Sequence, residues 1–233
     1  MAVTKRRWLV AAGVAIPLAA FAAVYLVFFT PDSPERLKLS ANESIAPAGG
    51  PSLAGEWRIA DGSVAGYRVR EKLAQLPSPS DAVGRTSAIS GGFTAEKHGD
   101  NLAIKGVRFE ADLTKLTSDQ QKRDNRIRTQ GLESERFPTA TFVTVDTFEV
   151  GESDVGTTPA HTKLKGDLTI HGVTKRVTIP IDVQRKDDRV EVAGSLTFPF
   201  SLFGMQPPSI PPLVSVTDNA TMEFDLFFAK TPL

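Results

Sequence analysis

The stretch GDLTIHGVTKRVTI, residues 166–179, holds two alternating runs of apolar and polar side chains joined by His171-Gly172. In the first run, Leu168 and Ile170 occupy every second position, as in a strand with one buried face. Glycine adopts positive φ readily, so a His-Gly pair at the joint is typical of a tight turn. The stretch therefore predicts an antiparallel hairpin with His171 at its corner.

The same alternation recurs along most of the chain and predicts an all-β domain of about eight strands. A change of parity near Gly106 indicates a β-bulge, and Pro180 indicates an edge or bulge position. Long antiparallel strands with one apolar face suit either a two-sheet sandwich or a closed barrel. Besides the hairpin, the runs cover 55–60, 63–72, 83–97, 102–113, 139–149, 190–200 and 222–228.

One segment, TSDQQKRDNRIRTQGLE at 117–133, lacks this alternation and predicts a short polar helix. Ser118 and Gln121 have capping-box spacing, and so polar a helix belongs on the surface or across an end of the barrel. Asp124 is interpreted as a local ion pair or cap. The basic side chains here fit either a solvated face or contact with anionic headgroups or a ligand's polar end: Lys122, Arg123, Arg126, Arg128 and Arg136.

The N-terminal region predicts a membrane anchor and a linker. Residues 1–7 form a basic end, and 8–29 are 22 uncharged residues, long enough for a transmembrane helix. The positive-inside rule places the N-terminus in the cytoplasm and the rest outside the membrane. A signal peptide cleaved near 20–23 is the alternative, in which case the protein is secreted. Residues 30–54, rich in Pro and Gly, predict a flexible linker before one domain at 55–230.

Composition and motifs argue against several functional classes. The 233 residues include no cysteine and 27 basic against 27 acidic residues, which excludes disulfides and thiol catalysis and gives no nucleic-acid footprint. His171 has no second histidine at metal-ligand spacing, and no catalytic or phosphate-loop motif occurs. We therefore predict no catalytic residue, no metal and no cofactor. The proline-rich segment 204–214 predicts a loop that either gates a barrel mouth or is merely a stiffened connection.

Taken with SERFPTATFV at 134–143, VGRTSAISGGF at 83–93 and WRIADGSVAGYRV at 57–69, the opening stretch resembles the YceI-like family of polyisoprenoid-binding proteins. The likeness covers 55–230 in the order of the family's motifs. It implies an antiparallel, eight-stranded, lipocalin-like barrel whose apolar tunnel holds a polyprenyl chain, in a family not known as enzymatic. Arg126 stands where many members have a histidine, and Ser63 and Arg70 stand near other such positions.

The function that this resemblance implies is binding, with possible transport or storage, of an isoprenoid lipid such as a polyprenol or isoprenoid quinone outside the cytoplasmic membrane. The alternatives are a lipid- or quinone-modifying enzyme using His171 or Asp124, and a structural envelope module with a filled core. Composition alone does not separate a solid core from a hollow bore. In a bore, the side chains predicted to contact the ligand are Tyr67, Phe109, Phe142, Leu168, Phe198, Phe200 and Phe224.

Overall fold

The computed structural model of the protein describes residues 33–41, 52–74, 79–156, 158–186, 188–209 and 211–231. The predicted membrane anchor at 8–29 and residues 42–51 of the predicted linker lie outside these ranges. Within them, no helix has the length and apolar character needed to cross a bilayer.

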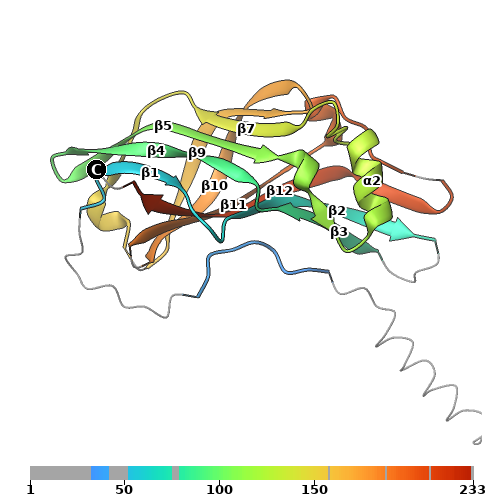
Figure 1. Ribbon diagram of the computed structural model, residues 1–233, viewed down its shortest axis with the longest axis horizontal. Helices are drawn as coiled ribbons and strands as arrows, with labels where there is room; N and C mark the ends of the chain where they lie inside the picture. Colours follow the sequence, from blue (N-terminus) through green and yellow to red (C-terminus); the bar gives the residue numbers. More distant parts are fainter. Residues whose placement is uncertain are drawn as a thin grey trace, which may run out of the picture.

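The described chain is built almost entirely of strands, with one α-helix at one end (Figure 1). Short 3-10 turns are η1 (Leu113–Lys115), η2 (Glu152–Asp154) and η3 (Phe200–Phe203), and the helix is α2 (Gln121–Thr129). The strands are β1 (Gly55–Ile59), β2 (Val64–Leu73), β3 (Ser80–Thr86), β4 (Ile89–His98), β5 (Asn101–Asp112), β6 (Thr117–Ser118), β7 (Thr139–Thr144), β8 (Phe148–Gly151), β9 (Ala160–Ile170), β10 (Val173–Lys186), β11 (Arg189–Phe198) and β12 (Val214–Lys230).

The sheet closes on itself, so the architecture is a barrel and not a sandwich. The ring runs β1-β4-β5-β7-β9-β10-β11-β12 and returns to β1, where Trp57 pairs with Lys230. All pairings are antiparallel, and β12 also pairs with β2 between Val214 and Asp225; β3 and β6 continue the sheet beyond β2. Closure leaves the eight ring strands without a free edge over the paired length. The predicted eight-stranded antiparallel barrel with one helix is confirmed.

The turn between β9 and β10 has the predicted form. Ile170 pairs with Val173, which leaves His171 and Gly172 as a two-residue loop with φ of 53° and 72°. Positive φ at both positions is the type I′ geometry that matches strand twist. His171 Nε2 lies 3.1 Å from Glu133 Oε1, and the ring packs on Phe137 at 4.3 Å between centroids. His171 is therefore a structural corner.

Several predicted element boundaries were wrong. The run 83–97 is two strands, because the chain bends at 87–88, where Ile89 N donates to Ser87 O. The run 139–149 likewise divides into β7 and β8. Ser118 is not an N-cap: its N–H and hydroxyl both donate to Asp124 Oδ1, at 3.0 and 2.7 Å, and α2 begins only at Gln121. Asp124 is thus a local hydrogen-bond acceptor for Ser118, and within the described ranges it forms no ion pair, so the ion-pair form of the prediction was wrong.

The predicted bulge at Gly106 is confirmed. Gly92 pairs with Arg108 and Thr94 with Lys105, so β5 carries one residue more than β4 between these pairs. Gly106 has φ of 62°, a conformation that glycine adopts without strain. Pro180 lies where β11 stops pairing with β10, since the last pair is Ile181 with Gly194. Its missing N–H therefore interrupts no bond to β11.

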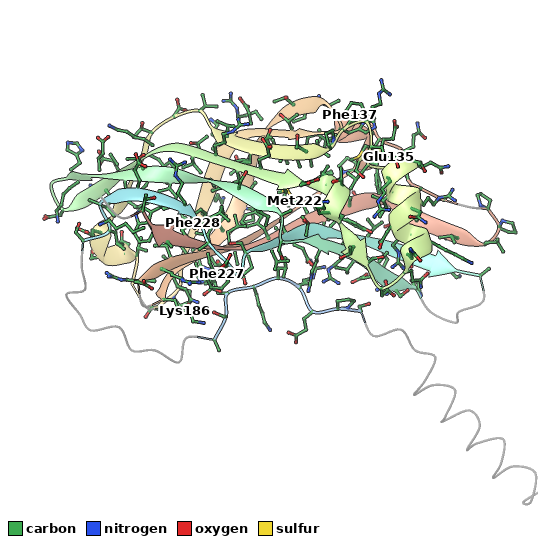
Figure 2. The ribbon with its side chains drawn as sticks, in the orientation of Figure 1. Glu135, Phe137, Lys186, Met222, Phe227 and Phe228 are labelled. Atoms are coloured by element: carbon green, nitrogen blue, oxygen red, sulfur yellow. The ribbon has the colours of Figure 1, made fainter. Side chains whose placement is uncertain are left out.

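Residues 33–41, here called the strap, lie against the outside of the barrel (Figure 1). Ser40 donates from its N–H and its hydroxyl to the two oxygens of Glu191, at 2.7 and 2.9 Å. Gln184 donates to Ser40 O at 3.0 Å, and Lys186, labelled in Figure 2, donates to Ser40 Oγ at 2.6 Å. This end of the strap is held by four hydrogen bonds, so it differs from the freely flexible linker expected there.

The other end of the strap rests on β2 and β3. Arg68 Nη2 donates to Pro34 O and Glu35 O, at 2.8 and 3.0 Å, and its Nε donates to Glu223 Oε2 at 3.2 Å. Glu223 points outward by alternation, yet it is only 1% exposed. A carboxylate on the outer face of a barrel is buried only if other groups pack over it. Here Arg68, Arg85 and the strap shield Glu223 from solvent.

Candidate functional site

A cavity of about 700 Å³ is lined in part by α2 and so lies toward that end of the barrel. Its volume falls in the range of roughly 300–1,000 Å³ typical of small-molecule sites. The lining comes mainly from β2, β12 and α2, with single residues of β5, β7, β9 and β11 and parts of β3, η1 and η3, and it is largely apolar. The principal apolar side chains are Ala65, Val69, Phe198, Phe200, Met205 and Met222.

The cavity reaches the surface between α2 and the proline-rich loop. Gln120 and Lys122 are exposed and line it, and so does Leu213, which is 57% exposed. Pro208 of the same loop also contributes to the wall. The loop predicted at 204–214 is thus at a barrel mouth, as one of its two interpretations required. Gating by this loop stays a prediction.

A second cavity of about 450 Å³ lies toward the opposite end. Its lining is aromatic and aliphatic, with Trp57, Phe93, Phe109 and Phe228 among its walls. Met222 lines the first cavity and Phe224, two residues further along β12, lines the second. Figure 2 shows Met222 nearer to α2 and Phe228 farther away. The two cavities therefore follow one another along the barrel.

Packed side chains occupy the interior between the cavities. Phe109 stacks on Phe142 with 6.3 Å between ring centroids, and Phe228 lies 5.5 Å from Phe109. Leu168 is 2% exposed and lines neither cavity. Gly166 gives Phe142 its place, because a Cβ there would lie 2.5 Å from Phe142 Cζ. The interior is thus partly hollow and partly filled.

The polar groups of the first cavity gather on its α2 side. Arg123 Nη2 donates to Glu71 Oε1 at 2.6 Å, and Arg123 Nη1 pairs with Asp119. The Tyr67 hydroxyl is buried, and burial raises the pKa of Tyr67 well above its usual range, so the group stays a protonated donor. Gly84 accommodates this ring, since a Cβ there would lie 2.3 Å from Tyr67 Cε1.

The structure distributes the seven predicted ligand contacts unevenly. Tyr67, Phe198 and Phe200 line the first cavity. Phe109 and Phe224 line the second, whereas Phe142 and Leu168 belong to the packed interior between them. Contact of any of these side chains with a ligand stays a prediction.

Sequence reasoning missed the small and charged residues of the first cavity. Space there depends on alanines at inward positions of the strands, such as Ala65 on β2 and Ala140 on β7. Ala65 precedes Tyr67 by two residues and Ala140 precedes Phe142 by two, so the strand alternation could have identified both alanines as inward-facing. Glu71 was missed because an inward carboxylate breaks the apolar pattern.

The two residues considered for acid–base catalysis, His171 and Asp124, do not lie together in one cavity. His171 lines neither cavity and faces Glu133 at the hairpin corner, while Asp124 is bonded to Ser118. Among the described residues, no group of three His, Asp or Glu side chains could hold a metal ion.

Comparisons with known proteins agree with this geometry. A family model described as the YceI-like domain matches residues 60–228. UPF0312 proteins of Vibrio vulnificus and Vibrio campbellii are 33% and 34% identical over 97 residues, which is 41% of this chain and 47% of theirs. The chain thus spans about half the length of the curated relatives that it matches.

Two solved structures share the fold. A polyisoprenoid-binding domain from Saccharophagus degradans, implicated in plant cell wall breakdown, is 17% identical with a TM-score of 0.57, over 75% of this chain and 98% of that one. BcnA of Burkholderia cenocepacia is also 17% identical, with a TM-score of 0.50 over 70% and 95%. At this identity the likeness concerns the fold.

Proposed function

Because the chain belongs to the YceI-like domain family, we propose that it binds an isoprenoid lipid, with the chain of the lipid in the first cavity. The observation that supports this most strongly is the apolar cavity of about 700 Å³ that opens between α2 and the proline-rich loop. An apolar cavity of roughly 150 Å³ holds one benzene ring. By that measure the first cavity has room for roughly 28 carbon atoms, or five to six isoprene units.

The expected affinity follows from the apolar contact. Burying a CH₂ group contributes about 0.8 kcal/mol as a gross term. For larger ligands the net gain is limited to about 0.3 kcal/mol per atom, so 25 carbons give about 7.5 kcal/mol. This corresponds to a dissociation constant of a few micromolar. No catalytic constellation is needed for such binding.

Carriage or storage of the lipid outside the cytoplasmic membrane is the further part of the proposal. Residues 8–29, as an uncleaved anchor, would hold the barrel beside a bilayer. A barrel near the bilayer takes up a water-insoluble ligand without a free aqueous step. Polyprenols and isoprenoid quinones both have chains of the required kind.

Photolabelling tests the binding proposal directly. The full chain in polymer-bounded native membrane discs is irradiated with a diazirine analogue of geranylgeraniol, and the labelled peptides are mapped by mass spectrometry. We expect label on 65–69 and 198–222, removed by excess unlabelled geranylgeraniol. Label that is confined to the barrel exterior, or that excess alcohol does not reduce, contradicts the proposal and favours a filled structural module.

A further inference from the structure

The polar lining of the first cavity consists mainly of hydrogen-bond donors. Tyr67 projects from β2, and Lys122, Arg123 and Arg126 project from α2. Glu71 is the single carboxylate among the described lining residues, and it is paired with Arg123 at 2.6 Å. Since Arg123 is paired with both Glu71 and Asp119, the cations that line this side without a carboxylate partner among the described residues are Lys122 and Arg126.

Two of these donors are buried without a partner. The Tyr67 hydroxyl and Arg126 Nε are both inaccessible to solvent, and neither has a hydrogen-bond partner in the described part of the chain. A buried donor left unpaired is unfavourable, and native proteins rarely retain one without a reason. Because neither atom is accessible to solvent, an acceptor oxygen of a ligand reaches them only when both side chains turn toward the cavity.

The basic side chains of α2 differ in whether they have a partner within the protein. Arg123 is held by Glu71 and Asp119, and Arg128 donates to Asn125 Oδ1 at 3.2 Å. Across the described ranges, neither Lys122 nor Arg126 lies within 4.0 Å of a carboxylate oxygen. These two cations therefore remain for a partner outside the described protein atoms, and both line the cavity.

The rest of the wall has a different character. Away from α2 the lining is formed by side chains such as Phe198, Phe200, Met205 and Ala220. A ligand that satisfies both regions is an amphiphile, with its chain among the apolar side chains and its head beside α2. A head group that offers only acceptor oxygens and carries negative charge complements three donors of which two are cations.

We propose that Tyr67, Lys122 and Arg126, here called the head-group cluster, bind the anionic head of an isoprenoid amphiphile such as a phosphate monoester. The inference rests on the proposed function, because the chain of the same ligand occupies the first cavity. It goes further by assigning the orientation of the ligand and a preference for a charged head over a neutral one. Arg126 supplies charge and directed N–H groups, and Tyr67 supplies a neutral hydroxyl donor.

A matched pair of ligands tests the inference. Geranylgeraniol and geranylgeranyl phosphate share one chain and differ only in the head. Each competes against the diazirine probe for the full chain in discs of a neutral phosphatidylcholine, and inorganic phosphate competes in a third arm. The variants are Arg126→Met, which keeps an apolar stem, and Tyr67→Phe. Arg128→Met is the control, because Arg128 lies on the same helix and does not line the cavity.

In the wild-type protein we expect the phosphate to bind at least about tenfold more tightly than the alcohol, equivalent to about 1.4 kcal/mol. Arg126→Met should reduce this preference to within about threefold, because the loss of one charge-assisted hydrogen bond weakens binding of the phosphate more than binding of the alcohol. Arg128→Met should keep the full preference. If Arg126→Met does not fold, Arg126→Gln replaces it.

Three results would overturn the inference. The first is equal affinity of the wild-type protein for the two ligands. The second is a preference for phosphate that survives both Arg126→Met and Tyr67→Phe. The third is displacement of the probe by inorganic phosphate as effectively as by the lipid phosphate, which would indicate a site for free anions. Failure of both lipids to bind is a separate result, and it would contradict the proposed function itself.

Discussion

Asp225 on β12 should make the stability of the barrel depend on pH near neutrality. The side chain points outward beside Glu191, and it is half-buried near the strap. Burial, reinforced by the neighbouring Glu191 carboxylate, raises the pKa of Asp225 from 3.8 to about 7. The folded protein therefore binds a proton that the unfolded chain releases near pH 3.8. Stability falls as the pH rises from about 4 through 7.

The size of the effect follows from this shift. Between pH 5 and about pH 7 the Asp225 carboxyl is protonated in the folded protein and ionised in the unfolded chain. Over these two pH units the free energy of unfolding falls by about 2.7 kcal/mol without screening. Since the side chain is only half-buried, solvent screening reduces the expected loss to about 1.4 kcal/mol. For a chain of this size, that lowers the melting temperature by about 3–5 °C.

Asp225→Asn tests this reasoning, because an amide resembles the protonated acid and does not titrate. Thermal unfolding of the full chain is followed by near-ultraviolet circular dichroism from pH 5 to pH 8, with the exposed Asp61→Asn as the control. Asp225→Asn should match the wild-type protein at pH 5 and melt about 3–5 °C higher at pH 8. A variant whose melting temperature falls with pH as much as that of the wild-type protein would refute the role of Asp225.

Substitutions at three further positions have defined outcomes. Glu191→Ala removes both carboxylate oxygens that accept from Ser40, so the Ser40 amide should exchange its hydrogen at least about tenfold faster. Hydrogen exchange is measured by mass spectrometry, and an unchanged rate would show that Glu191 does not hold the strap. Gly84→Val places a side chain where the Tyr67 ring lies, so competition assays should show weaker binding of geranylgeraniol; an affinity equal to that of the wild-type protein would contradict the position of the ring. His171 adopts positive φ, which asparagine tolerates and a β-branched residue does not. His171→Asn should therefore keep the stability of the wild-type protein, whereas His171→Val should lower the free energy of unfolding by about 1–2 kcal/mol. Equal urea midpoints for the two variants would refute the strain argument.

The strands and the hairpin corner could be predicted because their determinants are local. Alternation fixes the inward set that includes Leu168 and Phe224, and the His171-Gly172 pair fixes the turn. Closure into a barrel could not be obtained from alternation, since it depends on the pairing of Trp57 with Lys230 across the whole domain. That part came from the family resemblance.

The sequence could not predict which inward side chains border a cavity and which pack against one another. Phe142 and Phe198 have the same inward pattern, but Phe142 packs over Gly166 and against Phe109, whereas Phe198 borders open space. Which aromatic meets another depends on ring positions contributed by several strands. The strap was missed similarly, because its sequence has little apolar content and its contacts are hydrogen bonds to residues 33 to 151 positions away.

The chain length at which affinity stops rising tests the central claim most directly, namely that the first cavity holds the isoprenoid chain. Isoprenoid alcohols of 10 to 35 carbons compete against the diazirine probe for the wild-type protein, for Ala140→Phe, which fills the cavity, and for Thr139→Phe on the outer face of the same strand. From the volume of about 700 Å³, affinity should level off near 25–30 carbons, and the added ring should move that point about one isoprene unit shorter in Ala140→Phe alone. A levelling point that is the same in all three proteins, or an affinity independent of chain length, would contradict the account.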